Sequence, residues 1–168
     1  MLIVYLAQCY LSRDCHVNAI VMSLLKCIME IMGQGQIVIV DSDAIIAIVN
    51  QNDSNHTKAM ETLQFLDDSH VTLLFPATVI SEVITTVTFK LQRKDLVKQI
   101  VSLLDENDIY PIGGEEIGLA IKLYDPESSK RHTFFDAVVA ACAKQQKTVY
   151  IFSFDKWYKK SGFTLVSD

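Results

Sequence analysis

The chain has 168 residues, of which 50% are hydrophobic and 21% are charged, a composition that suits one globular domain and excludes a disordered chain. The net charge of −5 excludes a global basic field for nucleic acid, but it does not exclude a nucleic-acid substrate where carboxylates gather round cations. The four cysteines form no C-x-x-C pair, which excludes a disulfide framework and a cysteine zinc site and indicates a reducing compartment.

Residues 1–35 form a segment that differs in composition from the rest of the chain. Part of it has helical spacing of apolar residues, at Val17, Ile20, Val21, Leu24, Leu25 and Ile28. The first apolar run is too short to cross a bilayer and follows no basic residues, so we expect neither a membrane span nor a secretory signal. We interpret the segment as an N-terminal extension: a docked amphipathic helix, a weak membrane-surface anchor, or sequence translated from a start codon upstream of Met32.

Residues 36–168 alternate between predicted strands and helices. In chain order we expect a strand at 37–41, helices at 43–50 and 56–65, a strand at 71–75, helices at 78–91 and 94–104, a strand at 109–112, helices at 115–124 and 134–144, and strands at 148–152 and 163–167. This order predicts an α/β sandwich with a central, mostly parallel sheet of about five strands and right-handed crossovers.

Acidic residues stand where predicted strands end and helices begin. Asp41 ends the first strand, and Glu82 lies in the opening turns of the helix that follows the second strand. Asp136 begins the helix 134–144, which descends about 15 Å before the last long strand climbs back about 16 Å, so Asp155 should lie level with Asp136. The sequence therefore predicts four carboxylates at the carboxyl edge of the sheet, where open α/β sheets bind ligands.

Four like charges at close range must be protonated, separated or neutralised by a cation. Oxygen ligands without a histidine or cysteine partner favour a hard ion such as Mg2+ or Mn2+ over zinc, and a site of this kind can hydrolyse phosphodiesters. Taken alone, each acid could instead cap a helix or lie on the surface. Their convergence on one edge favours the metal site.

The same stretches resemble the PIN domain family. IVIVDSDAIIAIV is similar to the opening strand, acid and helix of PIN domains, and NHTKAM (55–60) to their H-x-x-A segment. Further similar stretches are ISEV (80–83) after Pro76, the helix FFDAVVAACA, and the closing IFSFDKWYKKSGF. The resemblance covers about residues 36–168, and it is strongest to the compact VapC-type toxin nucleases of prokaryotic toxin–antitoxin pairs.

The resemblance implies a three-layer α/β/α nuclease domain at 36–168 and an endoribonuclease that depends on Mg2+ or Mn2+. By motif position, the catalytic metal cage would consist of Asp41, Glu82, Asp136 and Asp155. Asp43 would be an accessory group, and the hydroxyl of Ser153 would support the site.

The expected partners follow from the same resemblance. We expect an RNA substrate, a cognate antitoxin of a type II pair, a homodimer and a cytoplasmic location. Lys90, Arg93 and Lys94 are candidates for contact with the RNA backbone, although a solvated helix face explains such a run equally well. His132 is expected to be a surface or capping residue rather than an RNA contact.

Two other functions fit parts of the sequence. One is a non-catalytic PIN-like module that binds RNA or protein without cutting it. The other is a haloacid-dehalogenase-like phosphatase with Asp41 as covalent nucleophile, because that family also has D-x-D after an apolar strand. The sequence lacks the Gly-Thr pair that should follow Asp43 in such a phosphatase.

Overall fold

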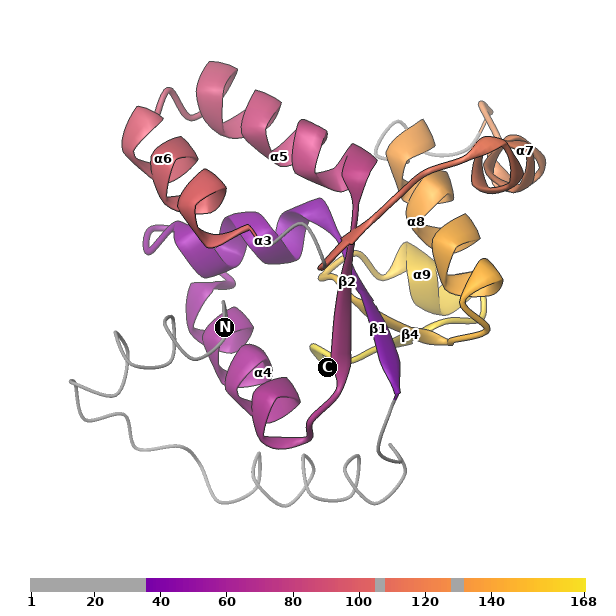
Figure 1. Ribbon diagram of the computed structural model, residues 1–168, viewed down its shortest axis with the longest axis horizontal. Helices are drawn as coiled ribbons and strands as arrows, with labels where there is room; N and C mark the ends of the chain where they lie inside the picture. Colours follow the sequence, from indigo (N-terminus) through magenta and orange to yellow (C-terminus); the bar gives the residue numbers. More distant parts are fainter. Residues whose placement is uncertain (1–35, 105–107, 128–131) are drawn as a thin grey trace.

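A computed structural model of the protein describes residues 36–104, 108–127 and 132–168 (Figure 1). The predicted N-terminal extension, residues 1–35, lies outside the described residues.

The order of the elements follows the predicted alternation of strands and helices. They are β1 (Ile37–Val40), α3 (Ser42–Val49), α4 (His56–Asp68), β2 (Thr72–Pro76), α5 (Ala77–Phe89), α6 (Lys94–Leu103), β3 (Ile109–Tyr110), α7 (Gly114–Leu123), α8 (Phe134–Gln145), β4 (Tyr150–Phe152), α9 (Trp157–Lys160) and β5 (Thr164–Leu165).

The five strands form one sheet in the order β3-β2-β1-β4-β5, and every pair of neighbours is parallel. The central strand β1 is in register with both neighbours, Ile39 pairing with Leu74 of β2 and with Ile151 of β4. The predicted sheet of about five mostly parallel strands is therefore confirmed. Because all strands run the same way, their carboxyl ends share one edge of the sheet.

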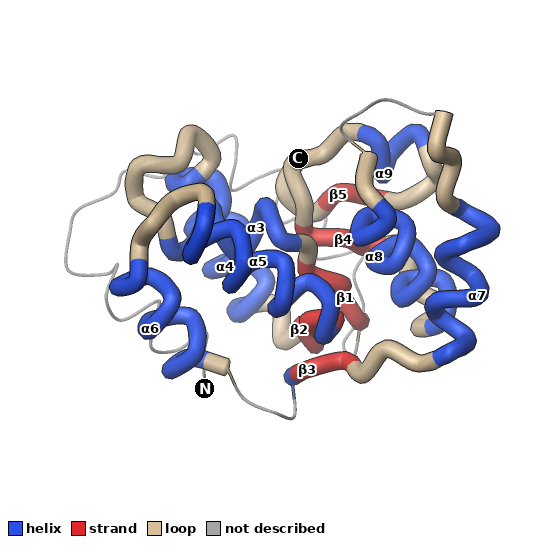
Figure 2. Tube along the Cα trace, turned by 90° about the horizontal axis from the view of Figure 1, so that it is seen from above, coloured by secondary structure: helices blue, strands red, loops and turns tan. Residues whose placement is uncertain are grey.

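Helices cover both faces of the sheet and complete the predicted three layers. Figure 2 shows α3, α4 and α6 on one side of the strands and α7 and α8 on the other. The run of small side chains from Ala137 to Ala143 in α8 is buried throughout, which lets this helix pack closely between α7 and β1. Cys142 lies within that run, as expected for a small core residue.

The structure differs from the predicted elements at the two edge strands and near the end of the chain. Strand β3 has two residues rather than four, because Pro111 has no N–H to continue the ladder. Strand β5 also has two residues and pairs with β4 alone. A short helix, α9, lies between the last two strands, where no helix was predicted. No helix in the described part of the chain is long and apolar enough to span a membrane.

Candidate active site

Asp41 leaves β1 and caps the next helix at the carboxyl edge of the sheet. Its backbone continues the ladder with a hydrogen bond from its N–H to Phe152 O, and its Oδ1 accepts from the N–H of Ser42 at 2.7 Å. Its Oδ2 accepts from two hydroxyls, Ser153 Oγ and Tyr158 Oη, each at 3.0 Å. The residue is only 3% exposed, so this carboxyl group is satisfied by protein donors rather than by bulk water.

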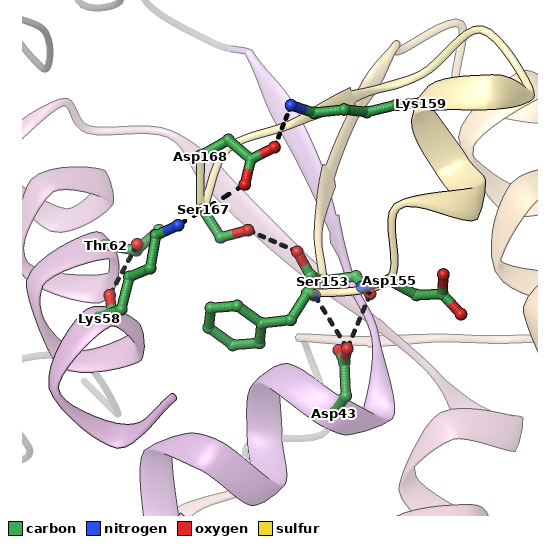
Figure 3. A network of polar contacts seen from close by, with 9 residues as sticks. Asp43, Lys58, Thr62, Ser153, Asp155, Lys159, Ser167 and Asp168 are labelled. Carbon is green, nitrogen blue, oxygen red and sulfur yellow. Dashed lines mark hydrogen bonds and ion pairs between the residues drawn. The ribbon is translucent and has the colours of Figure 1, made fainter. Parts of the chain in front are cut away.

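Ser153 follows β4 and bridges the carboxylates of Asp41 and Asp43, and Figure 3 shows its contact with Asp43. Its Oγ lies 3.0 Å from Asp41 Oδ2 and 3.0 Å from Asp43 Oδ2. A hydroxyl has one proton, so it donates to only one of these oxygens at a time. Asp43 Oδ2 also accepts from the N–H of Phe154 at 2.8 Å, and the N–H of Asp155 donates to Ser153 Oγ at 3.1 Å.

Asp136 and Asp155 lie at the starts of two helices on the same edge. Asp136 Oδ2 accepts from the N–H of Thr133 at 2.6 Å and from its Oγ1 at 3.1 Å, a capping box for α8. Asp155 Oδ1 accepts from the N–H of Trp157 at 2.8 Å at the start of α9. Capping and a place at the acidic edge are therefore compatible, because each cap bond uses one oxygen of the carboxylate.

Glu82 reaches the edge from the second turn of α5. It is half-buried, and Thr78, one turn earlier on the same helical face, has its hydroxyl buried without a hydrogen-bond partner. Asp43 Oδ1 is likewise buried without a partner. Two polar atoms near this edge thus lack the partner that buried polar atoms ordinarily have.

The carboxylates interact electrostatically with one another. Burial raises the pKa of Asp41 well above its ordinary value, and the charges of Asp43 and Asp136 raise it further. Burial also raises the pKa of Asp43 to about 6, with a contribution from Asp155.

The two remaining groups behave in the same way. Burial raises the pKa of Glu82, and the charges of Asp136 and Asp43 add to the effect. Burial raises the pKa of Asp136, and the charge of Asp155 adds to it. Each of the five acids therefore lies within electrostatic range of at least one other.

The chemistry of this donor set fits a hard divalent cation, because all its ligand atoms are oxygens and its mutual repulsion is unrelieved. No three His, Cys, Asp or Glu side chains within the described ranges stand close enough together to hold a metal ion. The all-oxygen donor set and the effect of each acid on the pKa values of its neighbours still favour a cation at this edge. Asp41, Asp43, Glu82, Asp136 and Asp155 are the residues that could hold the ion.

The three basic residues that were predicted to contact RNA differ in their surroundings. Arg93 is held by Asp95, with Nε 2.8 Å from Oδ1 and Nη2 2.6 Å from Oδ2, so its guanidinium is already paired. Lys90 and Lys94 are exposed, and the charge of Lys90 lowers the pKa of Glu82. His132 is half-buried, and its ring lies 4.7 Å from that of Trp157.

Tyr158 is the residue of this edge that sequence reasoning missed. It is fully buried, and its hydroxyl bonds to a carboxylate 117 positions earlier in the chain. Tyr158 stands three residues after Asp155, a spacing that faces the same way only on a helix. Because no helix was predicted between the last two strands, the direction of this side chain could not be inferred.

Comparison with known proteins places this geometry in a family. The family model of the PIN domain matches residues 38–163. No curated protein sequence matches the chain. The structure is similar to the crystal structure of Mycobacterium tuberculosis VapC20, a sarcin-ricin loop cleaving toxin, with a TM-score of 0.64 and 16% sequence identity over 76% of this chain and 96% of that chain. At this identity the likeness concerns the fold, whereas the family model spans most of the sequence. The chain belongs to the PIN domain family, a family of nucleases.

Proposed function

We propose that this protein is an endoribonuclease that depends on Mg2+ or Mn2+, and that it is a VapC-type toxin. The observation that supports this proposal is the gathering of five carboxylates from separate elements at the carboxyl edge of a parallel sheet, four of them with raised pKa values. Membership in the PIN family and the likeness to the VapC20 fold support it independently.

In this proposal, Asp41, Glu82, Asp136 and Asp155 are the catalytic residues that hold the ion. Asp43 is an accessory acid, and its buried, unpartnered Oδ1 is a further oxygen at the site. Ser153 supports both aspartates of the D-S-D motif through its hydroxyl.

When bound, the ion supplies positive charge that polarises a phosphodiester and promotes the attack of water on it. The protein contributes the rest by fixing the orientation of its carboxylates. The three hydrogen bonds to Asp41 and the capping bonds to Asp136 and Asp155 each restrict one side chain. Pre-set ligands lower the ordering needed when the substrate binds.

Lys90 and Lys94 are the proposed contacts to the phosphate backbone of RNA, while Arg93 has a smaller part because Asp95 already binds it. Replacing Lys90 or Lys94 with glutamine should weaken RNA binding and reduce the slope of log K against log salt by about 1 each. Arg93→Gln should change that slope less. Filter binding at three salt concentrations measures both effects.

We extend the proposal to the surroundings of the protein. A cognate antitoxin of a type II pair would restrain it, it would act as a homodimer, and it would be located in the cytoplasm. Residues 36–168 would be the nuclease domain, with residues 1–35 an N-terminal extension.

The test is cleavage of synthetic RNA in the presence of Mn2+, followed by addition of a chelator. We expect Asp136→Asn to abolish cleavage, whereas Asp68→Asn, on the exposed end of α4, should leave it unchanged. Equal rates for Asp136→Asn and the wild type would refute the site. Cleavage that survives chelation would refute the dependence on a metal.

A non-catalytic binding module is the competing function, because no three His, Cys, Asp or Glu side chains of the described residues stand close enough together to hold a metal ion. Calorimetric titration with Mn2+ separates the two: the nuclease binds the ion and the module does not. The phosphatase alternative has less support, because Asp41 is 3% exposed and both its oxygens already accept hydrogen bonds, which leaves it poorly placed for nucleophilic attack.

A further inference from the structure

We propose that Tyr158 is a positioning residue: its buried hydroxyl holds Asp41 so that Oδ1 is the oxygen presented to the metal ion. This inference rests on the proposed function. It adds a residue that belongs to neither the acidic set nor the serine that follows β4.

The two carboxylate oxygens of Asp41 accept different numbers of hydrogen bonds. Oδ2 lies 3.0 Å from both Tyr158 Oη and Ser153 Oγ, so its two lone pairs are directed at hydroxyl donors. Oδ1 has one donor, the N–H of Ser42 at 2.7 Å, and therefore keeps acceptor capacity. The protein thus leaves Oδ1 as the oxygen of Asp41 that is available to a cation.

Of the two hydroxyls, that of Tyr158 is the one committed to Asp41. The single proton of Ser153 is divided between Asp41 and Asp43, which lie at equal distances of 3.0 Å. Tyr158 has its hydroxyl bond to Asp41 at 3.0 Å. When the Ser153 proton turns to Asp43, Tyr158 still holds Oδ2 in place.

The packing of the ring explains how the hydroxyl is aimed. Tyr158 is 0% exposed, and its ring meets the rings of Trp157 and Phe163 edge-on at 5.1 and 6.4 Å between centroids. A phenylalanine would fill the same space without placing a polar atom in the core. Burying a hydroxyl has a desolvation cost that its hydrogen bond offsets, so the contact with Asp41 makes a tyrosine tolerable here.

The test compares two tyrosines that each donate to a carboxylate. Tyr158→Phe removes the donor to Asp41, and Tyr110→Phe removes the donor to Glu116 Oε1, which is 2.8 Å away at the start of α7. Loss of a partner that orients a metal ligand typically weakens metal affinity about 10- to 100-fold. We expect Tyr158→Phe to weaken Mn2+ binding on this scale by calorimetry and to lower kcat for RNA with little change in KM. Tyr110→Phe should leave both unchanged.

The outcomes separate this inference from the proposed function. If the wild type binds Mn2+ and Tyr158→Phe binds it equally well, the hydroxyl is only structural and this inference is wrong, while the proposed function stands. If the wild type binds no Mn2+, the proposed function fails and takes the inference with it.

A second variant serves if Tyr158→Phe does not fold. Ser153→Ala removes the shared donor and leaves the committed one. We expect it to weaken Mn2+ binding by less than about 10-fold, below the scale for losing an orienting partner. A larger loss would mean that Ser153, rather than Tyr158, holds Asp41, and would overturn the inference.

Discussion

Two tyrosine–carboxylate pairs in this protein have similar hydrogen bonds, but the pKa values of their carboxyl groups are shifted in opposite directions. Tyr158 donates to Asp41 at 3.0 Å, and Tyr110 donates to Glu116 at 2.8 Å. Both acids are largely buried, at 3% and 9% exposed. The pKa of Asp41 is nevertheless raised well above its ordinary value, whereas that of Glu116 is lowered.

The neighbours of each pair account for the difference. The bond from Tyr110 is the main cause of the lowered pKa of Glu116, and the N–H of Gly113 donates to its Oε2 at 2.9 Å, in the electropositive first turn of α7. Asp41 is more deeply buried and lies beside other acids, and these effects outweigh its donors. Glu116 is therefore an ordinary helix cap. Around Asp41, burial and the neighbouring acids disfavour the charged carboxylate despite its hydrogen-bond donors.

The largest expected effect comes from removing the charge of Asp41. Asp41→Asn should reduce RNA cleavage by at least about 100-fold, since losing a ligand exceeds the effect of losing a supporting hydrogen bond. The same change should raise the thermal midpoint of the metal-free protein, because it removes a buried charge from a crowd of like charges. Glu116→Gln is the matched control and should cleave at the wild-type rate. A destabilised Asp41→Asn protein that still cleaves RNA would contradict the comparison.

The acids round Asp41 and the carboxyl group of Glu116 should also change the free energy of unfolding in opposite directions with pH, when a chelator keeps the protein free of metal. The pKa of Asp43 is about 6 in the folded protein against an ordinary 3.8, so between these values the folded state binds more protons than the unfolded state. The free energy of unfolding should therefore fall as pH rises from about 4 to about 6, and Asp41, Glu82 and Asp136 act in the same direction.

Glu116 has the opposite sign, because its pKa is lowered below the ordinary 4.5. Its contribution is present above that pH and is lost as the pH falls through the lowered pKa. Urea midpoints measured from pH 3.5 to 8 should show both effects. Asp43→Asn should reduce the fall of the midpoint as the pH rises toward 6, and Glu116→Gln should reduce its fall as the pH drops below 4.5. A midpoint that rises steadily up to pH 8 would count against this account.

A smaller effect on stability at neutral pH is expected from replacing Glu116. Glu116→Gln weakens the cap of α7 and should lower the free energy of unfolding by about 1 kcal/mol. Chemical denaturation of the variant measures this loss, and calorimetry should find its Mn2+ affinity unchanged. A weakened affinity would mean that the two regions are coupled.

The smallest expected effect concerns Thr78, whose buried hydroxyl has no partner near Glu82. Thr78→Val keeps the shape and removes a polar atom that makes no bond, so stability should change by less than about 1 kcal/mol. A melting curve with and without Mn2+ tests this. A large loss of stability that occurs only with Mn2+ would mean that the Thr78 hydroxyl belongs to the site round Asp41.

Strong local patterns made much of this architecture predictable. The apolar run 37–40 and the small-residue helix 134–145 each indicate one structure, and parallel strands necessarily bring Asp41, Glu82 and Asp136 to one edge. The helix α9 and the two short edge strands were not predictable, because four or two residues carry too little periodicity.

The contacts of Tyr158 and Arg93 show the limits of sequence reasoning within the site. The tyrosine's bond to Asp41 spans 117 positions and depends on how a four-residue helix packs, which no local pattern encodes. The pairing of Arg93 with Asp95, two residues on, is a local contact, but Arg93 lies just before α6, where helical spacing does not fix the direction of a side chain.

The strand order also bears on how the protein is made. Strand β1 and Asp41 emerge from the ribosome early, but the hydroxyls that hold Asp41 come from Ser153 and Tyr158, 112 and 117 positions later, and β4 must pair with β1 before β5 can add beside it. Contacts this distant along the chain form late in folding. With the function proposed above, a growing polypeptide would therefore not cleave the RNA around it until almost all of the chain has been synthesised.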